Sequence, residues 1–216
     1  MKPALRSITL VAALAAAVNA HAVSDPAGDL LQSFTGDRTV AAFDILSSDV
    51  TFDSGANVFL LHAHTAGYIA DVPGAAYVFG FNRGGIANSP FADIGIPGVS
   101  FNATALLRSD GTGMVGATGI TSRVDGNDIF ATVSASLLPS NGFAAGDFTW
   151  ALWSIDSKIT GNFRNADFAP DANVGVAAVP EPETYALMLA GLGALVLVAR
   201  RRSRPSEACW QVIDGR

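Results

Sequence analysis

One alternating stretch indicates the fold class most clearly: Asp128-Ile-Phe-Ala-Thr-Val-Ser-Ala-Ser-Leu137. Every second residue from Ile129 onward is apolar, and residues two apart in a β-strand point to the same face. The turn-forming residues Asp125-Gly-Asn127 come directly before it. The stretch therefore predicts a strand with one face in a core and the other toward solvent.

The same kind of signal recurs along the chain. Short runs rich in β-branched and aromatic residues lie at 39–46, 49–52, 57–65, 76–81, 99–107 and 147–155, separated by Gly, Asp and Asn. The runs at 49–52 and 57–65 predict a hairpin across residues 53–56. Between the two apolar ends of the chain, no stretch keeps helical apolar spacing over three turns. Seven or eight strands at this spacing predict an all-β fold, an antiparallel β-sandwich or jelly roll.

The composition of residues 23–178 supports this fold class and excludes one kind of partner. This region has fifteen aspartates, no glutamate, five arginines and one lysine, a net charge of −9. Aspartate favours turns whereas glutamate favours helix interiors, so the bias agrees with a chain low in helix. An acidic domain repels phosphate backbones, which argues against nucleic acid as a partner. The single cysteine, Cys209, lies outside this region, so no disulfide is expected within it.

The N-terminus has the pattern of a secretory signal peptide over residues 1–22. Lys2 and Arg6 precede an apolar run at 8–18, and Ala20-His21-Ala22 is a small-x-small cleavage site. The alternative, a permanent N-terminal anchor, is disfavoured because the apolar run is short and polar residues follow it at once. We expect the mature chain to begin at Val23.

The C-terminus combines three features in a fixed order. Val179-Pro-Glu-Pro182 is followed by an uncharged apolar run at 185–199 and then by an arginine cluster at 200–202. At ~1.5 Å per residue the run spans roughly 22 Å, short for about 30 Å of bilayer hydrocarbon. We expect a transmembrane helix over 185–199, with the arginines on the cytoplasmic side. The order predicts a 23–166 ectodomain, a 167–179 linker, a 180–202 sorting segment and a 203–216 cytoplasmic tail.

This pattern resembles the PEP-CTERM sorting signal of Gram-negative bacteria. The resemblance rests on Val179, Pro180, Glu181, Pro182, the Ala186-Leu187-Met188 helix start, Gly191, Gly193, Arg200, Arg201 and Arg202. It implies processing by an exosortase, passage through the inner membrane, and delivery to the cell surface or extracellular space, commonly in species that make exopolysaccharide. One difference is that family members usually stop soon after the arginines, whereas this chain continues to Arg216.

Two histidines are the first candidate for chemistry in the exported domain. His62 and His64 are two apart in a predicted strand, so they point to the same face. Two imidazoles can ligate zinc or copper, but the sequence offers no HExxH motif and no cysteine as further ligands. We therefore expect no metal there, and interpret the pair as the polar face of a half-buried strand.

Three aspartate-rich loops are the second candidate. They lie at 25–29, 110–113 and 125–128, and loop oxygens are the ligands that calcium prefers. None has EF-hand spacing, and Asp-Gly is common tight-turn chemistry. The turn interpretation is favoured and no cofactor is expected, while a structural calcium ion stays open as an alternative.

Nothing in the exported domain marks a catalytic site. Residues 23–178 have no Gly-x-Ser-x-Gly motif and no glutamate to act as the general acid of a glycosidase. Several aromatic residues could instead stack on sugar rings or fill the core: Tyr68, Tyr77, Phe79, Phe81, Trp150 and Trp153. Trp150 and Trp153 are three apart and should face opposite sides of a strand, one in the core and one exposed, unless one of them lies at a bulge.

These observations predict a non-enzymatic, exported protein of the cell surface or extracellular matrix. We expect a structural or adhesive role in association with exopolysaccharide or biofilm. A carbohydrate-binding module with a discrete sugar site is the alternative. A secreted hydrolase that uses aspartates is less favoured.

Overall fold

The computed structural model describes residues 22–179 and 182–202, which belong to two separate compact units. The larger unit ends at Val179 and contains every strand of the described chain. The smaller unit contains helix α1 (Pro182–Arg202).

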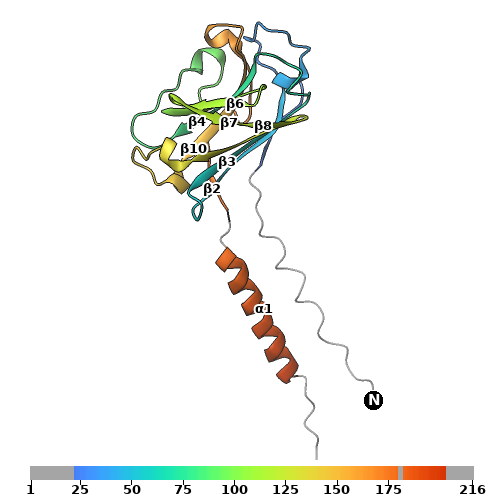
Figure 1. Ribbon diagram of the computed structural model, residues 1–216, viewed down its shortest axis with the longest axis vertical. Helices are drawn as coiled ribbons and strands as arrows, with labels where there is room; N and C mark the ends of the chain where they lie inside the picture. Colours follow the sequence, from blue (N-terminus) through green and yellow to red (C-terminus); the bar gives the residue numbers. More distant parts are fainter. Residues whose placement is uncertain (1–21, 180–181, 203–216) are drawn as a thin grey trace, which may run out of the picture. The chain divides into compact units, whose positions relative to one another are not determined.

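The larger unit consists of two sheets, and the all-β prediction is confirmed (Figure 1). The six-stranded sheet has the order β1 (Val23–Ser24), β2 (Ile45–Asp53), β3 (Val58–Thr65), β9 (Asp128–Ser134), β8 (Arg123–Asp125), with β13 (Ala177–Ala178) on β2. The seven-stranded sheet has the order β11 (Asn165–Phe168), β10 (Thr149–Asp156), β4 (Ala75–Asn82), β5 (Ala103–Arg108), β6 (Thr112–Val115), β7 (Thr118–Thr121), with β12 (Val174–Gly175) on β10. All pairs are antiparallel except β13 with β2.

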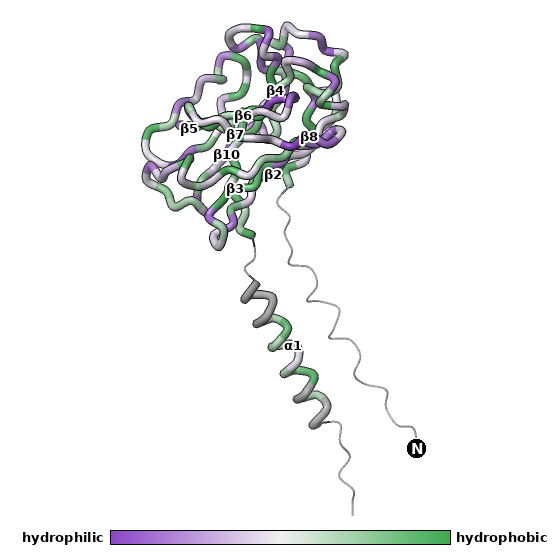
Figure 2. Tube along the Cα trace, viewed as in Figure 1, coloured by the Kyte–Doolittle hydropathy of each residue, from purple (hydrophilic) through white to green (hydrophobic). Residues whose placement is uncertain are grey.

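Short 3₁₀ turns connect several strands. They are η1 (Ala41–Phe43), η2 (Ala92–Ile94), η3 (Ala135–Leu137), η4 (Ala145–Asp147) and η5 (Gly161–Arg164). Hydrophilic segments mark several turns and loops of the domain, including the neighbourhood of β8 (Figure 2).

A core of aromatic residues lies between the two sheets. Phe59 of β3 contacts Phe81 of β4 across the interface and stacks on Phe148, each at a ring-centroid distance of 5.6 Å. Tyr77 and Trp150, from the seven-stranded sheet, are fully buried in the same cluster. The alternating apolar positions of the strands thus face inward from both sheets, which is the packing of a β-sandwich.

A second apolar layer covers the outer face of the seven-stranded sheet. Phe91 and Phe101, from the segment between β4 and β5, pack on Trp153 at centroid distances of 5.0 and 5.1 Å. Trp150 and Trp153 face opposite sides as predicted, since they belong to different clusters. The expectation that one of them is exposed is wrong. Their exposed fractions are 1% and 3%, because this covering segment buries Trp153.

The longer predicted strands are confirmed, with shifts at their ends. The hairpin across residues 53–56 is present, with Asp53 opposite Val58, and β9 begins at Asp128 after a turn containing Gly126 at φ +65°. The predicted strand at 39–46 is only partly confirmed, since residues 41–43 form the 3₁₀ turn η1 and only 45–46 belong to a strand, β2. The strands missed by the sequence analysis are short or rich in small residues, which weakens the alternating signal: β1, β6, β7, β8, β11, β12 and β13.

The predicted linker at 167–179 is wrong, because this segment belongs to the folded domain. Asp167, Phe168 and Ala169 are buried, and β12 and β13 each pair with a longer strand. The backbone N–H of Val179 still donates to Phe52 O at 3.1 Å. Small residues and a proline gave the segment a linker's composition, but it is held by backbone hydrogen bonds that composition does not reveal. The ectodomain therefore extends to Val179.

Helix α1 begins at Pro182, in agreement with the preference for proline in the first turn of a helix. Its apolar stretch is bounded by Glu183 and the arginines at 200–202. Among the residues described, none of the helices has the length and apolar character needed to span a bilayer. The transmembrane helix expected over 185–199 therefore stays a prediction.

Several predicted features lie outside the described residues. These are Ala20 and most of the signal peptide at 1–22, Pro180 and Glu181 of the sorting segment, and the tail at 203–216. They remain predictions. Gly191, Gly193 and the three arginines of the sorting segment lie on α1.

Replacing Gly80 with alanine tests the covered outer face. A Cβ at Gly80 in β4 would lie 2.7 Å from the Trp153 ring, whereas a Cβ at Gly119 in β7 would have no neighbour within 4 Å. We expect Gly80→Ala to lower the free energy of unfolding by about 1–3 kcal/mol through overpacking. The control Gly119→Ala should change it by less than about 0.5 kcal/mol. Urea unfolding of residues 22–179 measures both, and equal values for the two variants would contradict this packing.

Candidate functional site

A row of four side chains crosses the outer face of the six-stranded sheet. Cross-strand register aligns Asp49 of β2, His62 of β3, Phe130 of β9 and Arg123 of β8. Residues directly opposite one another on the same face are close enough to interact. The row therefore brings an acid, an imidazole, an aromatic ring and a guanidinium into contact.

His62 is clamped between two carboxylates. Its Nδ1 lies 2.8 Å from Asp49 Oδ1 and its Nε2 lies 2.8 Å from Asp128 Oδ1. His64 joins this group through Nδ1, 2.9 Å from the same oxygen of Asp128. The hydrogen bond to Asp49 raises the pKa of His62, with burial opposing and Asp128 adding to the rise. Burial opposes the shift at Asp128, but the hydrogen bonds from His62 and His64 hold its pKa below the usual value.

The hydrogen bonds of His62 and His64 test what the sequence predicts for these two residues. They share a face, as predicted, and both are partly buried. Both ring nitrogens of His62 are engaged by carboxylates, so neither is free to ligate a metal or to accept a proton from a substrate. The sequence analysis did not identify Asp49 and Asp128 as their partners, because that pairing depends on strand register.

A shallow groove of ≈ 510 Å³ runs beside this row. Its walls include Leu60, Thr121, Ser122 and Thr132. Phe130 stacks on His62 at a centroid distance of 4.5 Å. The guanidinium of Arg123 lies 4.8 Å from the centroid of the same ring. Because β3 and β8 flank β9 on opposite sides, both faces of the Phe130 ring are covered. The groove therefore offers hydroxyl groups, a guanidinium and aromatic edges, but no open aromatic face.

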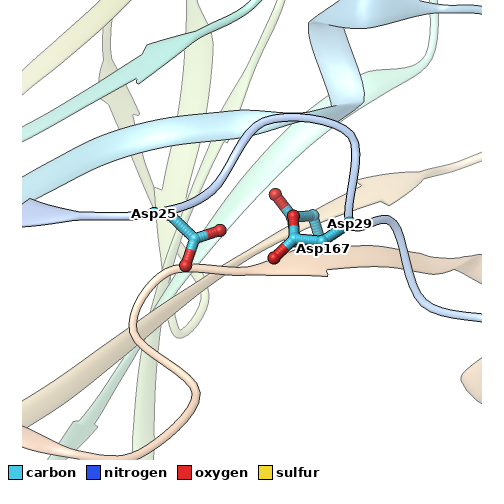
Figure 3. Close-up of side chains that lie close together, drawn as sticks. All are labelled: Asp25, Asp29 and Asp167. Atoms are coloured by element: carbon cyan, nitrogen blue, oxygen red, sulfur yellow. The ribbon is translucent and has the colours of Figure 1, made fainter.

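A second cluster consists of three carboxylates. Asp25 and Asp29 belong to the segment after β1, and Asp167 belongs to β11. Their oxygen atoms lie within 4.8 Å of one another (Figure 3). The sequence analysis noted the loop at 25–29 but placed Asp167 in a linker. The pairing of β11 with β10 and the hydrogen bond from Leu31 N–H to Ala166 O bring this distant residue to the loop.

Burial without a counter-charge dominates the electrostatics of this cluster. Burial raises the pKa of Asp167 to about 8 and that of Asp25 to about 7, and repulsion from neighbouring carboxylates adds to both shifts. Backbone N–H groups of Ile45 and Phe168 donate to the two oxygens of Asp167, at 2.7 and 2.9 Å, which opposes the rise in its pKa. Among the residues described, no arginine, lysine or histidine forms a salt bridge with these acids.

The other two aspartate-rich loops behave as turns. Asp110 Oδ1 accepts hydrogen bonds from the backbone N–H and the hydroxyl of Thr112, which lowers its pKa. Asp125 pairs with Arg123 at 3.3 Å. Neither loop belongs to a group of three or more possible metal ligands within the described chain.

The aromatic candidates are mostly core residues. Tyr77, Phe79 and Phe81 are fully buried, and only Tyr68 is well exposed, at 67%. A cavity of ≈ 500 Å³ that the sequence analysis missed lies on the outer face of the seven-stranded sheet. Trp153 contributes to its apolar wall, and Asn165 to its polar end. The Oδ1 atom of Asn165 is buried and has no hydrogen-bond partner in the described part of the chain.

The C-terminal segment matches a known family. The family model of the PEP-CTERM protein-sorting motif matches residues 178–202. The chain carries a PEP-CTERM sorting signal. This range contains every residue on which the sequence resemblance rests. A PEP-CTERM signal implies exosortase as the processing partner and export of the passenger. No curated protein and no solved structure matches the chain.

The clamp on His62 predicts a pH dependence of stability. The pKa of His62 is higher in the folded protein than in the unfolded one. Its contribution to the free energy of unfolding is therefore complete below the unfolded pKa of about 6.5. That contribution is lost as the pH rises through the folded pKa. We expect His62→Gln to remove it, roughly 1 kcal/mol, at low pH and to change stability less at high pH.

Urea unfolding of wild type and variant between about pH 5 and 8 measures this difference. The matched control is His64→Gln, which leaves the Asp49–His62–Asp128 clamp in place and should retain most of the slope. If the free energy of unfolding changed with pH in parallel for wild type and His62→Gln, the hydrogen bonds of His62 to Asp49 and Asp128 would contribute nothing to the pH dependence of stability.

Proposed function

We propose that this protein is a non-enzymatic component of the cell surface or extracellular matrix that associates with exopolysaccharide. The PEP-CTERM signal at residues 178–202 carries the proposal, because it directs the passenger to an exosortase and out of the cell. In this proposal the precursor is held at the inner membrane until it is processed. The β-sandwich is then the part that functions outside.

The arrangement of the histidines supports a role without catalysis. His62 and His64 are the only two histidines of residues 23–178, and both hydrogen-bond Asp128. A serine hydrolase needs an imidazole nitrogen free to accept the proton of the nucleophile, and His62 has none because Asp49 and Asp128 hold both of its ring nitrogens. The carboxylates of Asp25 and Asp167 are as close as those of a retaining glycosidase. However, Asp167 is 3% exposed and holds two backbone N–H groups, so a substrate has little access to it.

The groove beside the Asp49–His62–Phe130–Arg123 row supports polysaccharide as the partner. It is open, and Thr121, Ser122 and Thr132 can exchange hydrogen bonds with sugar hydroxyls. The net charge of −9 on residues 23–178 repels strongly anionic polymers. A neutral polysaccharide therefore fits this face best.

A discrete sugar site is the second candidate, and the cavity on the other sheet favours it. The apolar wall formed by Trp153 and Phe101 and the polar side chains of Asn162 and Arg164 are typical of a small-ligand site. The unpartnered Oδ1 of Asn165 would accept a hydrogen bond from a bound hydroxyl.

Variants of residues in the groove on the six-stranded sheet and in the cavity on the seven-stranded sheet distinguish these two candidates. We expect Thr132→Ala and Arg123→Ala each to weaken binding of the purified domain to exopolysaccharide by about 2- to 10-fold, because each removes a hydrogen-bonding group. Arg164→Ala, on the other sheet, is the matched control and should bind normally. Co-sedimentation with the polysaccharide and a glycan array measure the effect. Loss of binding only in Arg164→Ala would favour the discrete sugar site, and no binding to any glycan would refute both candidates.

The sorting signal predicts that the mature protein lacks everything from about Pro180 onward, including Cys209. Replacing residues 180–182 with alanines should leave the full-length chain in the inner membrane, because proline fixes φ and keeps this segment from continuing α1 upstream. Intact mass of surface and membrane fractions, from a host with an exosortase, measures the outcome. Detection of residues 205–216 still joined to the surface-exposed domain would refute the processing step.

A further inference from the structure

The cluster of Asp25, Asp29 and Asp167 has the dimensions of a cation site. One oxygen from each carboxylate lies within 4.8 Å of the other two. Calcium binds oxygen at about 2.3–2.6 Å, so two oxygens on one ion are at most about 5 Å apart. A single ion can therefore reach all three carboxylates with little movement of the chain. Figure 3 shows the three side chains converging from the loop and from β11.

A fourth carboxylate supplies an independent observation. Asp44 is 8% exposed, and its Oδ2 accepts a hydrogen bond from the backbone N–H of Gly28 at 2.8 Å. Because Gly28 lies between Asp25 and Asp29, this bond turns the Asp44 carboxylate toward the loop of the cluster. Its other oxygen, Oδ1, is buried and has no hydrogen-bond partner among the described residues. Asp25 Oδ2 is buried and unpartnered in the same way.

These unpartnered oxygens need an explanation, because burying an unsatisfied carboxylate oxygen is costly. No cationic side chain of the described chain forms a salt bridge with the cluster. Burial and mutual repulsion of the carboxylates raise the pKa values of Asp25 and Asp44, as expected where counter-charge is missing. A bound cation would supply both the missing charge and the missing partners.

We infer that Asp25, Asp29 and Asp167 bind one calcium ion, with Asp44 beside it as a further acidic group. Three carboxylate ligands without nitrogen or sulfur favour a hard cation over zinc or copper. Calcium suits the site better than magnesium, because it tolerates irregular oxygen geometry.

The ion would join parts of the domain that are far apart in sequence. Asp25 and Asp29 lie near the expected mature N-terminus, whereas Asp167 lies in β11 and accepts a hydrogen bond from Ile45 at the start of β2. A ligand that binds only the folded state stabilises it in proportion to the logarithm of its concentration. Calcium outside the cell would therefore stabilise the domain after export. This inference does not depend on the polysaccharide proposal.

Calorimetric titration of the full chain tests the site. The protein is kept in mild detergent, stripped with EDTA and titrated with calcium chloride. We expect one ion per chain, with a dissociation constant of about 1 mM or below, the range of extracellular calcium modules. In about 10 mM calcium the thermal midpoint should rise by roughly 3–6 °C relative to EDTA at a dissociation constant of about 1 mM, and by more for tighter binding. Magnesium at the same concentration should raise it much less.

Two aspartate variants provide the matched comparison. Asp29 is exposed, so Asp29→Asn should fold, yet it should weaken calcium binding at least 10-fold by removing a charged ligand. Asp71 is also exposed and lies outside the cluster, so Asp71→Asn should bind as wild type. Absence of both binding heat and a thermal shift in the wild type would overturn the inference. Equal weakening of calcium binding in Asp29→Asn and Asp71→Asn would also overturn the inference, because the effect would then be charge screening. An equal rise of the thermal midpoint with magnesium would overturn it for the same reason.

Discussion

The buried carboxylate of Asp167 connects the two sheets. It lies in β11 of the seven-stranded sheet, and its Oδ2 accepts the backbone N–H of Ile45, the first residue of β2 in the six-stranded sheet. Nearby, the hydroxyls of Ser154 and Tyr77 donate to Phe43 O and Ala42 O in η1. Satisfied polar groups at a sheet interface fix one relative position of the sheets, whereas apolar packing alone tolerates several. The same carboxyl group also lies beside Asp25 and Asp29, so the structural connection and the candidate calcium site depend on one residue.

A strand can be predicted from the sequence when the residues that determine it lie within the strand or next to it in the chain. β9 is evident from alternating side chains, and β3, β4 and β10 from runs of aromatic and β-branched residues between turns, because these signals lie in or next to the strand itself. β11 and β13 carry no such signal, since they are held by hydrogen bonds to strands distant in sequence. Trp153 shows the same limit. Its face could be predicted from spacing, but its burial depends on Phe91 and Phe101, which reach it from another segment.

In the candidate sites, too, only the arrangement of residues close together in the sequence could be predicted. Spacing placed His62 and His64 on one face, but only the register of β2, β3 and β9 brings Asp49 and Asp128 to them. This register decides the chemistry of His62, because the two carboxylates raise its pKa and occupy both ring nitrogens, whereas a free imidazole is a base or a ligand. The acidic cluster depends still more on long-range structure, since Asp167 lies more than a hundred residues from Asp25.

The end of the domain and the start of the sorting signal are adjacent in the chain. The motif match begins at residue 178, inside β13, and Val179 still hydrogen-bonds to Phe52. No spacer therefore separates the fold from the segment that an exosortase reads. β13 pairs through only two residues, and so short a strand adds little stability and opens readily. Opening β13 would extend the accessible chain without disturbing the aromatic core around Phe59, because that core draws on the longer strands of both sheets. Local opening of this last strand would therefore serve where a separate linker is absent, since the core around Phe59 does not depend on it.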